Sequence, residues 1–201
     1  MPDLADEVRA CRLCADRFTA TATAHQPRPV VWFRPGAHLL VAGQAPGTRV
    51  HASGRPFTDP SGDRLRDWTG LDAETFYDLD RVVIVPMAFC FPGQTAAGAD
   101  LAPPAICART WRARVMAALP GLRLTLALGG PAIRWHLGPL PVDRAVRDWR
   151  RHLARSRVFP LPHPSWRNSG WLNRNPWFAA ELIPALRAEV AAALDDALPE
   201  G

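Results

Sequence analysis

The sequence predicts a three-layer α/β/α protein, in which a central, mostly parallel four-stranded sheet lies between two layers of helices. Short apolar runs bounded by Gly and Pro alternate with segments of helical periodicity, which is typical of this class. Hydrophobic residues make up 48% of the chain, enough to bury one sizeable core. No Ser/Gly-rich or charged linker divides the 201 residues. We therefore expect a single domain over residues 1–201, with a short flexible tail from about 196.

Each expected strand is a short apolar run that ends at or near a Gly or Pro. The apolar runs predict four strands, at residues 38–43, 81–86, 123–128 and 157–161.

The expected helices begin and end at recognisable capping residues. An amphipathic segment covers residues 2–15, and a helix over 61–70 has Ser at its start and Gly at its end. Further helices are predicted over 104–119 and 142–153. The last helix is predicted to start with Asn175 as its cap and Pro176 in its first turn. Its buried face is predicted from apolar residues at helical spacing, namely Leu182, Ile183, Leu186, Val190 and Leu194.

Three loops rich in Pro and Gly follow the expected strands, at residues 44–62, 89–102 and 162–173. Each leaves the carboxyl end of a strand, the edge of a parallel sheet where ligands bind. The first loop carries Gly43-Gln44-Ala45-Pro46-Gly47 and then Gly54-Arg55-Pro56-Phe57. The third carries His163-Pro164-Ser165-Trp166-Arg167-Asn168. Either motif alone could be a tight turn or an incidental exposed loop, and their combination favours a functional site.

Four cysteines have a spacing that suits a metal centre. Cys11 and Cys14 form a Cys-x-x-Cys pair, while Cys90 and Cys107 come from distant segments. Four such thiolates can complete a shell for zinc or for a 4Fe-4S cluster, and the alternative is a set of buried apolar thiols. Spacing alone does not separate zinc from iron-sulfur.

Taken together, the motifs resemble those of the uracil-DNA glycosylase superfamily, and the similarity runs from Cys11 to the final helix. The chain looks most like the bacterial and archaeal branches that carry an iron-sulfur cluster. Their first motif is similar to Gly-Glu-Ala-Pro-Gly followed by Thr-Gly-Arg-Pro-Phe. This resemblance implies a 4Fe-4S cofactor on the four cysteines, with zinc as the alternative, and DNA as the partner.

The resemblance also assigns roles to residues of the motifs. Phe57 would stack on a base flipped out of the helix, in a pocket formed with Gly43 and Ala45. His163 would donate a hydrogen bond to the departing base, and the backbone around Gln44 would hold the attacking water. The loop that enters the duplex would contribute DNA contacts from Ser165, Arg167, Asn168 and Trp171, although the tryptophans could equally be packing residues.

Three departures from the superfamily pattern bear on mechanism. Ala45 stands where the best-known branch has a water-activating Asp, and the iron-sulfur branches likewise have Ala at this position. His51 is a candidate substitute base. Residues 84–89 contain no amide where the related enzymes have an Asn that reads uracil. Gln44 replaces the Glu of the nearest motif. The identity of the base therefore stays open.

Basic residues concentrate near the third loop. All 24 of the Lys and Arg positions are Arg. Residues 144–174 contain eight of these arginines and one acidic residue, Asp148, so the net charge of this segment is +7, whereas that of the whole chain is +5. Such a patch favours a nucleic-acid surface.

These observations predict a monofunctional DNA glycosylase that removes uracil or another deaminated base. The chain has no Lys, which excludes a Schiff-base lyase step. The alternative is a non-catalytic member that binds DNA or a damaged nucleotide, and a weaker one is an α/β hydrolase, although no Gly-x-Ser-x-Gly elbow is present. No apolar run is long enough for a membrane span, so we expect a cytoplasmic monomer without membrane contact.

Overall fold

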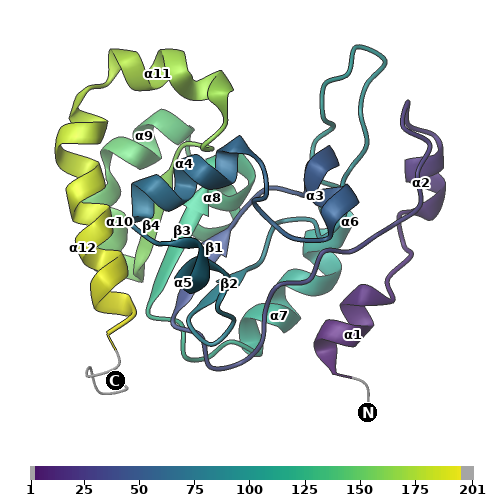
Figure 1. The fold of residues 1–201 in the computed structure, drawn as a ribbon, viewed down its shortest axis with the longest axis horizontal. Helices are drawn as coiled ribbons and strands as arrows, with labels where there is room; N and C mark the ends of the chain where they lie inside the picture. The colour runs from purple at the N-terminus through teal and green to yellow at the C-terminus, as the bar shows by residue number, and fades with distance from the viewer. Residues whose placement is uncertain (1–2, 196–201) are drawn as a thin grey trace.

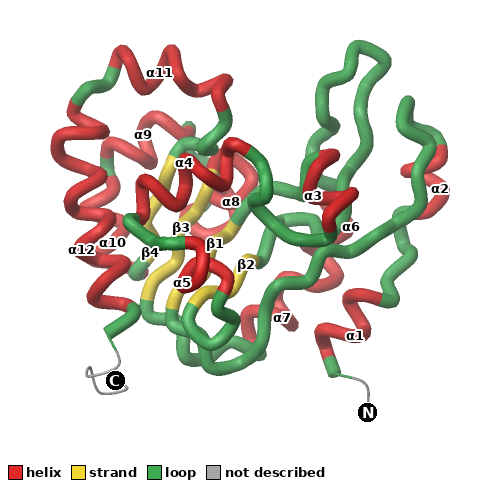
Figure 2. Tube along the Cα trace, viewed as in Figure 1, coloured by secondary structure: helices red, strands yellow, loops and turns green. Residues whose placement is uncertain are grey.

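The computed structural model describes residues 3–195, and the predicted flexible tail from about 196 lies outside this range. Its centre is a sheet of four parallel strands in the order β2-β1-β3-β4, where β1 is Leu39–Ala42, β2 Val82–Ile84, β3 Leu124–Leu128 and β4 Val158–Leu161. Every strand lies within one of the predicted segments. Helices cover both faces, so the three-layer α/β/α prediction is confirmed (Figures 1 and 2).

Alternate residues of the strands pack into two separate cores. Leu39 and Val41 belong to the core that also holds Leu65 and Leu186. The helices that contribute to that core include α4 (Pro60–Thr69), α5 (Ala73–Tyr77) and α12 (Ile183–Ala193). Leu40 lies in the other core, against α1 (Leu4–Arg9), α7 (Ala113–Ala117) and α8 (Gly129–Leu137). Burial of both faces explains why the strands read as continuous apolar runs.

Three predicted helices are divided in the structure. The segment 2–15 forms α1 and then α2 (Ala15–Thr19), because the chain turns over Cys11 to Cys14 between them. The segment 142–153 forms α9 (Val142–Arg147) and α10 (Trp149–Ser156), which are separated at Asp148. The segment 104–119 forms α6 (Ala105–Cys107), a π-helical turn η1 (Ala108–Arg112) and α7.

Helix starts differ from prediction in two places. Helix α4 is capped by Asp59, whose carboxylate accepts from the Gly62 N–H at 3.2 Å, rather than by Ser61. Asn175 does not cap the last helix through its side chain, because that side chain is buried and bonds Arg147, Trp171 and Trp177. The last helix begins with a π-helical turn, η3 (Phe178–Leu182).

Several elements lie in segments that the sequence left as loops. The first loop contains α3 (Thr48–Ser53), and the third contains η2 (Trp166–Asn168) and most of α11 (Ser169–Arg174). Figure 2 shows a long projecting loop between β2 and α6, beside α3. No helix among residues 3–195 is long and apolar enough to cross a membrane.

Candidate active site

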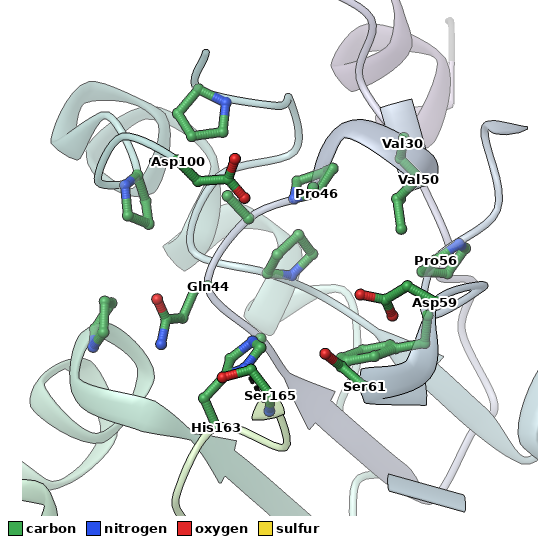
Figure 3. A pocket seen from close by; sticks show the side chains of 18 of the residues that line it. Val30, Gln44, Pro46, Val50, Pro56, Asp59, Ser61, Asp100, His163 and Ser165 are labelled. Atoms are coloured by element: carbon green, nitrogen blue, oxygen red, sulfur yellow. Dashed lines mark hydrogen bonds between the residues drawn. The ribbon is translucent and has the colours of Figure 1, made fainter. Parts of the chain in front are cut away.

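The carboxyl ends of the strands open onto a cavity of about 650 Å³ (Figure 3). All three predicted loops line it, and Pro131 at the start of α8 completes the wall. From β1 the sheet extends to β2 on one side and to β3 on the other. The cavity therefore lies at the switch point of the sheet, where parallel α/β folds leave a crevice for ligands.

The Gly43–Ala45 segment forms one wall and is tied to the second loop. The Gly43 carbonyl accepts from the Met87 N–H, and the Gln44 carbonyl accepts from the Ala88 N–H, both at 3.0 Å. Within residues 3–195 no acceptor takes up the N–H of Gln44 or Ala45. Both amides are thus available to a bound molecule.

Phe57 lines the cavity in an unusual backbone conformation, with φ at +54°. Its ring lies edge-on to Phe76 at 6.0 Å and close to Gly43, where a Cβ would be 3.7 Å from its Cζ. A Cβ on Gly62 would lie only 1.9 Å from the Phe57 carbonyl oxygen. Glycine is therefore required at position 62 to seat this turn.

His163 also lines the cavity and has a defined tautomer. Its Nδ1 accepts from the Ser165 backbone N–H at 3.3 Å, so in the neutral ring the proton is on Nε2. Burial lowers the pKa of His163, an effect that the nearby Asp59 carboxylate partly opposes. At neutral pH the ring is a neutral donor through Nε2.

Three further polar residues line the same cavity without having been assigned to the site from the sequence. Asp59 and Ser61 lie beside His163 in Figure 3, and Asp100 lies across the cavity from them in this view. Asp59 caps α4 with one carboxylate oxygen, and Gln94 donates to Asp100 at 3.0 Å. The signal for Asp59 was present, since Asp followed by Pro is typical of a helix start.

Gln44 and His163 approach each other around Gly129. A Cβ on Gly129 would lie 2.4 Å from Gln44 Nε2 and 3.4 Å from His163 Cβ. Gly129 also has a φ of +74°, which favours glycine. The glycine that opens α8 thus allows two predicted site residues, from the first and third loops, to share one side of the cavity.

Residues 30–187 match the sequence model of the Uracil DNA glycosylase superfamily. The chain belongs to this superfamily. Membership supports a DNA glycosylase-type hydrolase function with DNA as the partner. It also agrees with the cavity, because Gly43, Gln44, Ala45, Phe57 and His163 all line it.

The third loop of this superfamily member is braced from within. Asn168 donates through Nδ2 to the His163 carbonyl at 2.7 Å, and Arg64 of α4 donates to the Ser165 carbonyl at 3.0 Å. Trp166 is 75% exposed, and Arg167 lies over its ring at 6.0 Å. Ser165, Arg167 and Asn168 line the cavity as well.

Two predicted site residues of this superfamily member lie elsewhere. Trp171 packs against Trp177 and Phe178, its Nε1 donates to Asp143 at 2.9 Å, and it is not part of the cavity wall. The His51 ring contacts His25 and Phe91 and does not line the cavity, whereas its neighbour Val50 does. Burial lowers the pKa of His51, with His25 and Arg28 contributing.

All four cysteines line a second, small cavity together with apolar residues that include Leu13, Ile106 and Trp111. Burial raises the pKa of Cys90 to about 12 and that of Cys107 to about 11, and the other cysteines add to both shifts. The Phe89 N–H donates to Cys107 Sγ at 3.4 Å. No group of three or more His, Cys, Asp or Glu among residues 3–195 is arranged to hold a metal ion.

The arginine patch of this superfamily member is partly neutralised. Four of its eight arginines form ion pairs, with partners that include Asp143, Glu181 and Glu189; the paired arginines are Arg144, Arg147, Arg150 and Arg157. Asp143, Glu181 and Glu189 lie outside residues 144–174, the segment over which the net charge was counted from the sequence. Arg167 is the member of the patch that lines the cavity.

Proposed function

We propose that the protein is a monofunctional DNA glycosylase that hydrolyses the N-glycosidic bond of uracil or another deaminated base flipped out of DNA. The observation that carries this proposal is the cavity at the switch point, in which an aromatic ring, Phe57, and a neutral imidazole donor, His163, face the same space.

The first step is capture of the flipped nucleotide. Unstacking a base costs a few kcal/mol, which stacking on an aromatic side chain partly offsets. Phe57 supplies that ring, and the cavity of about 650 Å³ has room for a nucleotide.

Bond cleavage leaves negative charge on the departing base. The Nε2–H of His163 is the donor that we assign to the base oxygen, because Nδ1 is already occupied by the Ser165 N–H. A preorganised donor in a buried site is worth about 3 kcal/mol of transition-state stabilisation. The free N–H groups of Gln44 and Ala45 are the second set of donors on this wall.

We assign the orientation of the attacking water to Asp59. The motif itself contributes no carboxylate, since Gln44 and Ala45 stand at the two positions that could carry one. Asp59 lines the cavity, keeps one oxygen free of the α4 cap and is close enough to influence the pKa of His163. His51 lacks this access, so Asp59 replaces it as our candidate base.

The four cysteines are proposed to hold a 4Fe-4S cluster. In a cubane each thiolate binds a different iron, so the sulfurs need not converge on one point as they must for zinc. Four thiols around one cavity suit that donor set, although they do not form a single-ion site. Such a cluster would tie the Cys11–Cys14 turn to Cys90 and Cys107 and would have a structural role.

The test is a strand-cleavage assay on labelled oligonucleotides that carry one uracil, hypoxanthine or xanthine, followed by alkali. Excision of at least one base is expected, and the pattern would name the substrate. The matched test variant is Asp59→Asn, which keeps a cap for α4 and should reduce turnover without loss of DNA binding.

A non-catalytic binding role is the second candidate, and a specific observation favours it. Ile84 and Pro86 line the cavity where the related enzymes have an amide that reads uracil. Tight binding to damaged duplexes without any abasic product would select this alternative.

A further inference from the structure

Tyr77 bonds the backbone of Phe57, the residue that carries the stacking ring of the proposed site. It is the only tyrosine in the chain and ends the short helix α5. Its hydroxyl is within hydrogen-bond distance of two successive carbonyls, Pro56 at 2.8 Å and Phe57 at 2.9 Å. The single hydroxyl hydrogen is therefore shared between the carbonyls of the two peptide groups on either side of the Phe57 Cα.

Arg66 reinforces the same point from α4. Its Nη1 is 3.3 Å from both the Phe57 carbonyl and the Tyr77 hydroxyl, and its Nη2 is held by Asp63 at 2.6 Å. The Arg66 side chain is only 18% exposed, so these contacts are largely shielded from water. Two donors from two helices thus converge on one carbonyl.

That carbonyl belongs to a residue that does not adopt its conformation without support. A non-glycine residue with positive φ costs about 1–2 kcal/mol, and a bulky aromatic residue rarely adopts it. Phe57 has φ of +54° and sits against Gly62, where no Cβ fits. Conformations of this kind persist when the surrounding structure over-determines them, and they cluster at functional sites.

We propose that Tyr77, with Arg66, is a positioning residue for base capture, because it holds the Phe57 backbone in the conformation that directs its ring at the flipped base. This inference rests on the proposed function. The phenol ring itself packs independently, under Arg55 at 3.7 Å and beside Trp32 and Phe76. Removing the hydroxyl alone therefore separates positioning from packing.

The test is a double-mutant cycle that measures capture and not turnover. Binding is compared between a duplex with one non-hydrolysable 2′-fluoro-2′-deoxyuridine and the same duplex with thymidine, for the wild type, Tyr77→Phe, Phe57→Leu and the double variant. We expect Tyr77→Phe to reduce the preference for the fluorouridine duplex by about 5-fold, as for loss of one hydrogen bond of about 1 kcal/mol. In the Phe57→Leu background we expect no further loss.

The matched control is Thr69→Val. Thr69 is buried in α4, and its hydroxyl is within hydrogen-bond distance of the Leu65 carbonyl at 2.9 Å and the Arg66 carbonyl at 3.1 Å, so this variant removes a buried hydroxyl of the same helix that does not bond Phe57. Thr69→Val should lower the melting temperature without changing the preference for the fluorouridine duplex.

Because Tyr77 is the sole tyrosine, fluorotyrosine labelling gives one ¹⁹F resonance, which should shift on capture of the flipped base.

An equal loss from Tyr77→Phe in both backgrounds, or no loss at all, would overturn the positioning role and leave the proposed function intact. Failure of the wild type to prefer the fluorouridine duplex would overturn uracil capture and with it the positioning role, whereas the proposed function falls only if the strand-cleavage assay shows no excision of uracil, hypoxanthine or xanthine.

Discussion

At the scale of single residues, His163 carries the sharpest prediction. His163→Ala should lower kcat by about 100-fold, the effect of removing one preorganised donor, while affinity for a damaged duplex changes little. Single-turnover excision and fluorescence anisotropy measure the two quantities separately. His38→Ala, which changes a histidine outside the cavity, is the control. Unchanged turnover in His163→Ala would remove this imidazole from the chemistry.

The residues of the cavity show what a motif can and cannot predict. Phe57, His163 and Gln44 were predicted from the motifs, and all three line the cavity. His51 was chosen because it titrates near neutrality, but the orientation of α3 turns its ring toward His25 and Phe91. Tyr77 has no local signal, because only the tertiary fold brings it to the Phe57 carbonyl.

At the scale of elements, the cysteine cavity joins the turn between α1 and α2 to the segments around Cys90 and Cys107. If a 4Fe-4S cluster occupies it, anaerobically purified protein should be brown and absorb near roughly 400 nm. Cys107→Ser should abolish this absorbance and make the segment before β1 more sensitive to protease, since the cluster ties it down. Iron and sulfide analysis gives the number of iron and sulfide ions per chain. A colourless wild-type protein without iron or zinc would contradict the metal site.

Strands were easier to predict than helices in this chain, for a physical reason. Each strand is buried on both faces and so reads as a continuous apolar run, as β3 does. Helix α8 begins with Gly129-Gly130-Pro131, which locally favours a turn, and α3 and α5 are too short for periodicity to be visible. The π-helical turn before α7 and the division at Asp148 are likewise products of packing.

At the scale of the whole molecule, a buried pair links stability to pH. Arg112 is 1% exposed and donates to the Val85 carbonyl and to His136 Nε2, at 2.5 and 2.6 Å. Burial, with a contribution from Arg112, lowers the pKa of His136 to about 3. Between that value and an ordinary histidine pKa of about 6.5, the unfolded chain binds a proton that the folded chain does not. The stabilisation is complete above that window and is lost as the pH falls through it.

The free energy of unfolding should therefore fall by about 1–2 kcal/mol from pH 7 to pH 5 on account of this residue. His136→Gln keeps an acceptor for Arg112 but does not titrate, so its unfolding should depend less on pH. Urea denaturation at the two pH values measures the difference, with His38→Gln, a histidine that does not contact Arg112, as the control. Equal pH dependence in all three proteins would show that His136 is not the source.

The distribution of charge over the molecule decides where DNA binds. The sequence predicted a patch of eight arginines over residues 144–174, but half of them form ion pairs, and Arg167 alone of the patch lines the cavity.

Arg167→Ala should weaken binding to DNA of any sequence and reduce the slope of log K against log salt by about 1. Arg150→Ala, which removes a cation paired with Glu181 at 3.4 Å, should change neither. Salt titrations of both variants measure the two slopes. A reduced slope in Arg150→Ala with an unchanged slope in Arg167→Ala would place the phosphates along α9 and α10, and the cavity mouth would then not be the place where the duplex enters.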